Sequence, residues 1–373
     1  MSPALPFRRQ HARSRVLGIR RLQLFALFFG VALFAALLRG IGLEVILAGV
    51  DQIGWGLAVV IVLELGVDAV NTLGWRYTFA PEDRRIGLPT LFFVRLAGTA
   101  FNQAVPSASV GGEPIKVMLL RPYIAAGSAW ASVITDKLSY ALAQAIFVLA
   151  GFTVAFGRLD LPARLSQGLV AALILTIAGL AIFLALQRRG LFAATAAAAR
   201  RLPLPERWVN ALAAGTAAVD QSIRDVYAAR RGDFLRSVTW HLSGFGLGIV
   251  QIYLLLRWLA LPADMVTCIA IEAFSLLIQL TLFLVPASLG VQEGGKALIF
   301  TALRLPAAAG MSVGIACRLT QLAGIALGFG AFAILHQREG APLTESPLCR
   351  ARSLGLRLFA SARCNDPRRR NIE

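Results

Sequence analysis

Long runs of apolar residues follow one another along most of this chain, and short polar links separate them. The runs cover about residues 22–38, 53–75, 128–156, 167–186, 237–259, 265–285 and 307–335. An α-helix needs about 20 apolar residues to cross the hydrocarbon core of a bilayer. The pattern therefore predicts an all-α protein, a polytopic transmembrane helix bundle of about eight membrane segments.

One apolar run is too short to cross and ends in residues that a bilayer rejects. Residues 88–101 are apolar, and residues 102–121 read NQAVPSASVGGEPIKVMLLR. Backbone that is not helical survives at membrane depth only where protein or a water-filled cavity surrounds it. We therefore predict a re-entrant hairpin over residues 88–122, broken between Pro106 and Gly112.

A second stretch, PASLGVQEGGK, repeats the spacing of the first. Both contain the order Pro-x6-Glu-x2-Lys, and its members are Pro106, Glu113 and Lys116 in the first copy and Pro286, Glu293 and Lys296 in the second. Internal repeats with broken helices are common in transporters. The recurring spacing therefore predicts an internal repeat in the membrane domain.

The basic residues indicate which links face the cytoplasm, but they leave the orientation of the repeats open. Arginines gather in residues 1–21, 187–236 and 337–373, and such segments stay on the cytoplasmic side. Both termini are therefore expected inside, with an even number of crossings. If residues 287–305 form a discontinuous crossing, both motifs lie near the cytoplasmic face. An inverted repeat would place them on opposite faces.

Composition agrees with a membrane protein. Of the 373 residues, 57% are hydrophobic and 15% are charged, whereas about 25% are charged in soluble proteins. The net charge of +17 suits anionic lipid headgroups, and we expect no nucleic-acid partner. The expected organisation is a basic N-terminus over 1–21, a transmembrane domain over 22–336 with an amphipathic cytoplasmic loop over 187–236, and a flexible tail over 337–373.

Two predicted spans carry carboxylates at membrane depth. In the second span Glu64, Asp68 and Asn71 are spaced by four and three residues and share one helical face, and Glu272 lies in the sixth span. Such residues normally face a bundle interior or a cavity. A polar contact between helices and a role in transport are both compatible with this face. A single histidine, His241, is assigned no role.

The motif residues suit a ligand with a polar headgroup. Broken helices expose free N–H groups and partial charges at their ends, and a Glu–Lys pair at i and i+3 can neutralise itself or open to a ligand. We therefore expect substrate-binding residues among Asn102, Pro106, Gly111, Gly112, Glu113, Lys116, Asp136, Lys137, Glu272, Pro286, Gly290, Glu293, Lys296 and Arg318.

Other kinds of chemistry find little support in the sequence. Four cysteines form no CxxC pair and three histidines are scattered, so we expect neither a metal nor a cofactor. No GxxxxGK[ST] loop for nucleoside triphosphates occurs. We expect no catalytic residues.

The motifs resemble those of a known membrane family. NQAVPSASVGGEPIK, followed by ASVITDKLSYALAQ, and FLVPASLGVQEGGK resemble the two signatures of the flippase-like lysylphosphatidylglycerol synthase transmembrane region family. The resemblance covers about residues 20–336, and the GGEP-I-K and TDK forms also resemble the branch among hopanoid-biosynthesis membrane proteins. It implies a bundle with re-entrant segments that moves or handles lipids. The implied signature positions are Asn102, Pro106, Gly111, Gly112, Glu113, Asp136, Pro286, Gly290 and Glu293.

This chain departs from the family pattern in two ways. Lys137 stands where many relatives have an arginine, and lysine lacks the planar fork that binds phosphate in a bidentate manner. The 37 residues after position 336 are too few for the aminoacyl-transferring domain of the bifunctional synthases. Lysyl transfer to lipid is therefore not expected.

The resulting hypothesis is a lipid flippase-like transporter rather than an enzyme. It would move or bind a lipid of the phospholipid, polyprenyl-phosphate or hopanoid class, with an anionic or hydroxylated headgroup, through a groove lined by the two motifs. Further copies of this chain, in a homo-oligomer, and proteins of lipid biosynthesis are additional candidate partners. The alternatives are a non-catalytic scaffold of a lipid-biosynthesis complex and a membrane enzyme that uses Glu and Asp as acid and base.

Overall fold

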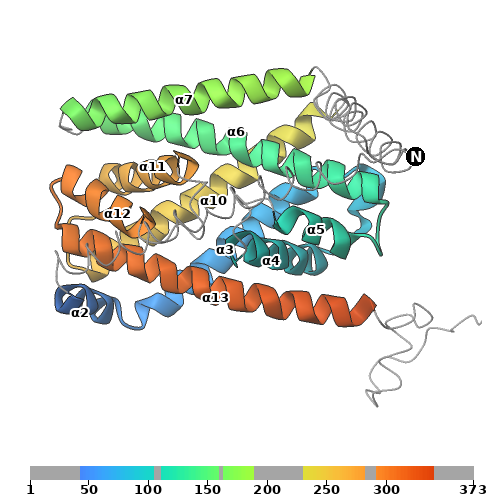
Figure 1. Ribbon diagram of the computed structural model, residues 1–373, viewed down its shortest axis with the longest axis horizontal. Helices are drawn as coiled ribbons and strands as arrows, with labels where there is room; N and C mark the ends of the chain where they lie inside the picture. Colours follow the sequence, from blue (N-terminus) through green and yellow to red (C-terminus); the bar gives the residue numbers. More distant parts are fainter. Residues whose placement is uncertain (1–42, 105–110, 159–162, 189–229, 282–290, 340–373) are drawn as a thin grey trace, which may run out of the picture.

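A computed structural model describes residues 43–104, 111–158, 163–188, 230–281 and 291–339 (Figure 1). Its elements are α2 (Leu43–Ile53), α3 (Gly56–Arg76), the 3-10 helix η1 (Pro81–Arg85), α4 (Leu88–Ala104), α5 (Gly112–Leu120), α6 (Ala126–Arg158), α7 (Ala163–Arg188), α10 (Arg231–Trp258), α11 (Met265–Thr281), α12 (Val291–Ala302) and α13 (Ala307–Glu339). Every element in these ranges is a helix, which confirms the predicted all-α class.

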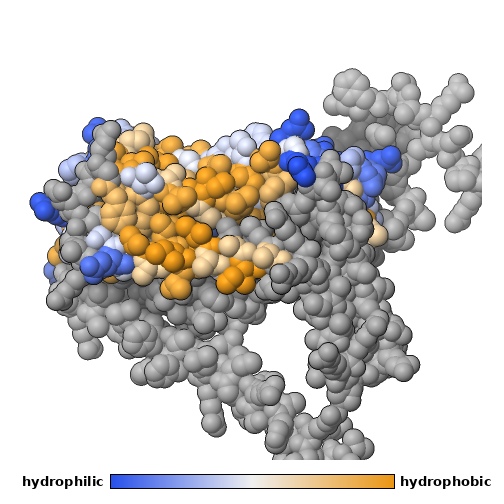
Figure 2. Space-filling view, turned by 90° about the horizontal axis from the view of Figure 1, so that it is seen from above, coloured by the Kyte–Doolittle hydropathy of each residue, from blue (hydrophilic) through white to orange (hydrophobic). Residues whose placement is uncertain are grey.

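Four of the described helices are long and apolar enough to cross a membrane: α3, α6, α10 and α13. Figure 2 shows a broad apolar surface with hydrophilic residues at both ends of the long axis. Ile174, Leu175 and Ile182 of α7 are exposed, as expected for a surface that faces lipid. Apolar side chains carry no hydrophobic free-energy penalty when they are surrounded by hydrocarbon instead of water. The molecule is therefore a multi-span membrane bundle.

Helices α3 and α10 run antiparallel and define the two ends of the bundle. At one end Trp55, just before α3, lies 6.4 Å from Trp258 at the end of α10, measured between ring centroids. At the other end Arg230, just before α10, donates a hydrogen bond to the carbonyl of Tyr77, just after α3, at 3.1 Å. We call these the tryptophan end and the arginine end. The arginine end holds Arg76, Arg84, Arg85, Arg121, Arg230, Arg231 and Arg236 together with Glu82, Asp83 and Asp233. The tryptophan end holds fewer arginines, Arg257 and Arg304, together with Glu44, Asp51 and Asp264.

Two broken helix pairs enter the bundle from these opposite ends. The first pair, α4 and α5, begins and finishes at the arginine end, and the second pair, α11 and α12, begins and finishes at the tryptophan end (Figure 1). In each pair the first helix has 17 residues and is too short to cross alone. Residues 105–110 and 282–290 of the two breaks lie outside the described residues.

The long helices interlock the two repeats, α3–α6 and α10–α13. Both α6 and α13 have 33 residues, about 50 Å at 1.5 Å per residue. Helix α6 starts beside its own α5 and reaches α11, where Phe152 and Phe274 pack with ring centroids 5.1 Å apart. Helix α13 starts beside α12 and reaches α4, where Phe329 and Phe101 pack at the same distance. The repeat is therefore inverted.

Several predicted boundaries need correction. Residues 287–305 are not a discontinuous crossing, because α12 returns to the end from which α11 started; the motifs therefore do not share one face. Helix α12 begins at Val291, so Glu293 and Lys296 lie on this helix. The predicted link 40–52 contains helix α2. Helix α13 extends to Glu339, three residues into the predicted tail. The predicted span 22–38, most of the loop 187–236 and the rest of the tail lie outside the described residues.

Glycines allow the interlocked helices to approach closely. A Cβ placed on Gly328 of α13 would lie 2.4 Å from the carbonyl oxygen of Leu96 on α4, whereas one on Gly330 would meet nothing within 4 Å. Backbone cannot move aside as a flexible side chain can. We therefore predict that Gly328→Ala lowers unfolding stability by about 1–3 kcal/mol, as measured by thermal unfolding in detergent.

Gly330→Ala is the matched control on the same helix. It should change stability by less than about 1 kcal/mol, and in the stabilising direction, because alanine is the better helix former. Equal losses in the two variants would contradict the close packing of α13 on α4.

Candidate functional site

The glutamate of the first motif holds three helices together at the arginine-end pair. Glu113 Oε1 accepts a hydrogen bond from Asn102 Nδ2 of α4 at 3.1 Å and pairs with Lys137 Nζ of α6 at 3.1 Å. Asn102 Oδ1 accepts the backbone N–H of Gly112 at 2.7 Å, which satisfies an unpaired donor at the start of α5. Asn102, Glu113 and Lys137 thus bridge the break; we call them the first clamp.

The second motif builds an equivalent clamp at the tryptophan-end pair. Glu293 Oε1 of α12 accepts a hydrogen bond from Arg318 Nε of α13 at 2.8 Å. Arg318 also donates to Gln321 at 3.1 Å, and Gln321 donates to Gln292 at 3.1 Å. Lys137 and Arg318 occupy the same place in the repeat, because each is the twelfth residue of its 33-residue helix. Glu293 and Arg318 form the second clamp.

Both clamp glutamates are buried and keep one oxygen free of hydrogen bonds. Glu113 is 4% exposed and Glu293 2%. Within the described residues, the Oε2 atom of each has no hydrogen-bond partner. A buried carboxylate needs a cation nearby, and the clamps supply one in each repeat. The arrangement ties each short helix to the long helix that follows it.

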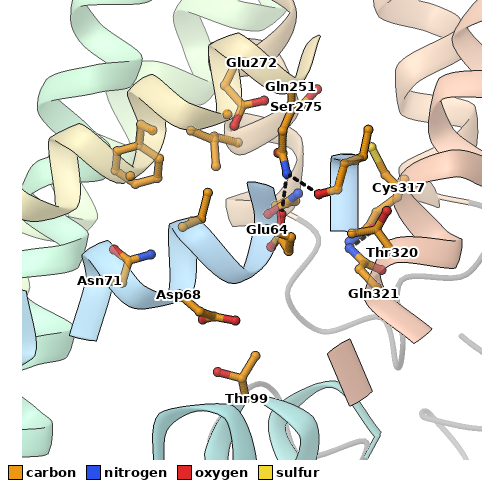
Figure 3. Close-up of a pocket in the computed structure, with 18 of the residues that line it drawn as sticks. Glu64, Asp68, Asn71, Thr99, Gln251, Glu272, Ser275, Cys317, Thr320 and Gln321 are labelled. Carbon is orange, nitrogen blue, oxygen red and sulfur yellow. Dashed lines mark hydrogen bonds between the residues drawn. The ribbon is translucent and has the colours of Figure 1, made fainter. Parts of the chain in front are cut away.

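A polar cavity of about 320 Å³ lies between the repeats (Figure 3). Carboxylates reach it from two helices, Glu64 and Asp68 from α3 and Glu272 from α11, and Arg95 and Lys296 bring positive charge. Further hydrogen-bonding groups that line it are Asn71, Thr99, Gln103, Gln251, Ser275, Gln279, Gln292, Thr320 and Gln321. An apolar bundle therefore encloses a lining rich in donors and acceptors.

The side chains that line the cavity form few hydrogen bonds with one another. Gln251 donates to Glu64 Oε2 at 3.0 Å, the bond drawn in Figure 3. Lys296 Nζ donates to Ser275 Oγ at 3.4 Å, a long bond. Glu272 lies against Gly248, since a Cβ on that glycine would be 2.6 Å from Glu272 Oε1. These groups can therefore turn to a ligand at small cost.

A buried ionic network borders the cavity. Arg95 Nη1 of α4 donates to Asp136 Oδ2 of α6 at 3.2 Å and to the carbonyl of Asn71 at 3.2 Å, and its Nε lies 3.6 Å from Asp68 Oδ1. His241 of α10 lies between Asn71 and Asp136. All except Asp68 are less than 9% exposed. The network joins α3, α4, α6 and α10.

The structure divides the sequence-predicted site residues into three groups. Glu272 and Lys296 line the cavity. Asn102, Gly112, Glu113, Lys137, Glu293 and Arg318 form or support the clamps, Gly111 directly precedes α5, and Lys116 and Asp136 are buried beside them. Pro106, Pro286 and Gly290 lie outside the described residues. The second motif thus reaches the cavity through Lys296, whereas the two clamp glutamates are not part of the cavity lining.

Sequence reasoning missed several cavity and network residues. Arg95 interrupts an apolar run that was otherwise taken as uniform, and an arginine at membrane depth is itself a sign of function. Gln251 and Gln321 are uncharged and carry no such signal. His241 was given no role, although its ring is fully buried between two polar partners.

Comparison with known proteins finds one matching family model and one similar protein. The model of the lysylphosphatidylglycerol synthase TM region matches residues 23–328. A UPF0104 membrane protein of Methanothermobacter thermautotrophicus is 33% identical over 165 residues, which are 42% of this chain and 47% of that protein. The aligned part therefore spans about half the length of this relative. No solved structure matches the chain.

The second clamp makes a stability prediction. Glu293→Gln removes the charged partner of Arg318, whose side chain is 17% exposed, so unfolding stability should fall by about 1–3 kcal/mol. Arg236→Ala is the control, because Arg236 pairs with Asp233 while its side chain is 66% exposed, and such pairs contribute about 0–1 kcal/mol. Thermal unfolding in detergent measures both. Losses of equal size would mean that the clamp does not hold α12 to α13.

Proposed function

Because this chain belongs to the family of the lysylphosphatidylglycerol synthase transmembrane region, we propose that it is a flippase-like transporter of polar-headed lipids. It lies in the inner membrane with both termini in the cytoplasm. The observation that carries the proposal is the polar cavity of about 320 Å³ enclosed between two inverted repeats of an apolar bundle. A lipid headgroup would occupy this cavity while its acyl chains remain in the bilayer.

The lining suits a headgroup that is both anionic and hydroxylated. Lys296 can pair with a phosphate, and Arg95, whose charge is balanced by Asp68 and Asp136, offers N–H donors. The carboxylates and the amides of Gln251 and Gln321 offer acceptors and donors to hydroxyl groups. Without such groups, a charged headgroup in hydrocarbon would pay the full cost of losing its water. The cavity lowers that cost midway across the membrane.

The two re-entrant pairs provide access from opposite sides. One pair enters from the arginine end and the other from the tryptophan end, and transporters with inverted repeats bind their substrate where such repeats meet. Each pair is held to a long helix by one clamp. Rocking of one repeat against the other would open the cavity to one leaflet at a time. The P-loop is missing from the sequence, so an ion gradient or mass action supplies the drive.

Transport makes a direct prediction for a cavity residue. Glu272→Gln should slow the movement of fluorescent phosphatidylglycerol between leaflets by about ten- to hundredfold, the equivalent of one hydrogen bond to a charged group. The measurement follows bleaching of the outer leaflet by dithionite in proteoliposomes. Glu44→Gln, on exposed α2, is the control and should behave as the wild type.

The same preparations distinguish the alternatives. A scaffold would move no lipid in the wild type, and an enzyme would convert the lipid chemically in detergent, where membrane sides do not exist. Wild-type rates equal to those of empty liposomes, for phosphatidylglycerol and for a panel of polyprenyl-phosphate and hopanoid lipids, would refute the transport proposal.

The orientation makes a second prediction. Basic segments stay in the cytoplasm, so the arginine end should face inside and the tryptophan end outside. In a chain whose cysteines are replaced by alanine, Pro262→Cys should react with an impermeant maleimide added to spheroplasts. Tyr123→Cys, between α5 and α6, should react only after permeabilisation. Labelling of both from the same side would contradict the inverted arrangement.

A further inference from the structure

Lysine is rare in this chain, and every lysine lies in a motif or a clamp. Lys116, Lys137 and Lys296 are its three lysines, and the other 34 of its 37 basic residues are arginines. Lys116 and Lys296 follow the motif glutamates at the same spacing. Lysine carries a single charge at the end of a flexible stem, whereas arginine presents a rigid planar fork. The motif positions therefore hold the basic residue that changes place most readily.

The two motif lysines contact equivalent residues of the re-entrant helices. Gly98 is the eleventh residue of α4, and Ser275 is the eleventh residue of α11. A Cβ placed on Gly98 would lie 2.5 Å from Cγ and from Cε of Lys116, so the stem of this lysine lies on the glycine. Lys296 Nζ instead donates to Ser275 Oγ at 3.4 Å. The two lysines therefore correspond to one another in the inverted repeats.

Other equivalent positions line the cavity from both repeats. Arg95 and Glu272 are each the eighth residue of the first helix in their pair. Tyr140 and Gln321 are each the fifteenth residue of the long helix that follows. All four line the cavity. The cavity therefore lies where the two repeats face one another with equivalent surfaces.

The second helix of each pair breaks this symmetry. Gln292, Gly295, Lys296 and Ile299 of α12 line the cavity, whereas no described residue of α5 does. Alternating access in transporters with inverted repeats moves one repeat against the other around a fixed site. Because the repeats are equivalent, the state of opposite access places α5 at the cavity, in the way that α12 lies there now.

Lys116 is held weakly in its present position. Its side chain is 7% exposed, and among the described residues its one ion pair is with Glu113 Oε1 at 3.9 Å, which is too long for a hydrogen bond. Its Nζ otherwise lies over the Trp75 ring, 5.5 Å from the centroid. Within the same part of the chain, Trp75 Nε1 and Glu113 Oε2 have no hydrogen-bond partner. A buried ammonium among such groups gains hydrogen bonds when it turns to a polar cavity.

The ionic network keeps its charge balance when Lys116 turns. Lys116 and Arg95 interact electrostatically with Asp68 and Asp136. Asp68 also lines the cavity, so a lysine that turns into the cavity remains near that carboxylate. The repeats differ at other residues, so the exchange concerns the positions of α5 and α12 and not their complete linings.

We propose that Lys116 is a second headgroup-binding residue, which leaves Gly98 and Trp75 and binds the lipid phosphate in the state of opposite access. The proposal rests on the transport function proposed above. In the present state Lys296 lines the cavity and is the lysine that binds phosphate. In the other state α12 withdraws, and Lys116 takes the equivalent place. One ammonium from each repeat thus faces the headgroup in turn.

The first experiment follows the lysines directly and needs no lipid movement. The protein in phosphatidylcholine nanodiscs, which contain no other lipid amine, is treated with N-hydroxysulfosuccinimidyl acetate. Mass spectrometry then gives the acetylation rate of each lysine. In Gly98→Ala the rate at Lys116 should rise about tenfold, because the new methyl group takes the space of the lysine stem. The rate at Lys296 should fall, because the same shift withdraws α12 from the cavity.

The Gly98→Ala variant should fold, because the atoms that its Cβ meets belong to a flexible side chain. Gly246→Ala on α10 is the matched control, since a Cβ there meets nothing within 4 Å, and it should leave both rates unchanged. Local unfolding would raise the rates at both lysines together. A rate at Lys116 that does not rise, or a rise without a fall at Lys296, would overturn the proposal.

The second experiment tests the ligand with glycerol 3-phosphate, a soluble analogue of the phosphatidylglycerol headgroup. At ten times its dissociation constant it should slow acetylation about tenfold, because the unliganded fraction falls by that factor. The protected residue should be Lys296 in the wild type and Lys116 in Gly98→Ala. Glycerol at the same concentration is the control and should protect neither. If Lys116 in Gly98→Ala reacts equally fast with and without glycerol 3-phosphate, it is not a phosphate ligand.

These experiments also separate this proposal from the proposed function. If the wild type moves no lipid but acetylation and protection shift from Lys296 to Lys116 as expected, transport fails while the second phosphate-binding residue stands. If lipid moves but Lys116 neither becomes reactive nor is protected in Gly98→Ala, transport stands and the role of Lys116 is refuted.

Discussion

Compensation of buried charge determines how this bundle is built. In the low dielectric of a membrane interior, a carboxylate without a cation or a proton is costly, and a cation without a carboxylate is equally so. Three buried carboxylates each pair with a cation of another helix: Glu113 with Lys137 joins α5 to α6, Glu293 with Arg318 joins α12 to α13, and Asp136 with Arg95 joins α6 to α4. The same pairs that remove the electrostatic cost therefore hold the short re-entrant helices against the long ones.

The inverted repeat follows from this pairing together with close packing. Each long helix begins beside the re-entrant pair of its own repeat and ends beside the pair of the other, so neither repeat can bury its surface alone. Glycines let the backbones approach at these contacts: Gly112 faces the carbonyl of Gly98, and Gly328 faces that of Leu96. In lipid, association of helices depends on such contacts between small residues.

The sequence was informative where one physical rule dominates. Hydrophobic length predicted the long helices, and the spacing Pro-x6-Glu-x2-Lys predicted an internal repeat whose clamps proved equivalent. It could not orient the repeats, because the spacing of Glu113 and Glu293 is the same for a parallel and an inverted copy. The sequence analysis also expected a ligand at Glu113 and Glu293. In the structure, Oε1 of each glutamate forms an ion pair with a basic residue of the helix that follows it. The role of Arg95 and His241 depends on which helices meet, and that is decided by packing across the whole chain.

Comparison of corresponding positions explains why the two repeats are not interchangeable. Asp136 is the eleventh residue of α6, and Cys317 is the eleventh residue of α13. Asp136 belongs to the buried ionic network, whereas Cys317 lines the cavity with a thiol. The clamps beside them differ as well, since the Lys137 side chain is 46% exposed and that of Arg318 is 17% exposed. Here the first repeat holds the ionic network and both repeats line the cavity, and Asp68, Asn71 and Arg95 belong to the network and to the cavity lining. The network and the cavity are therefore in direct contact.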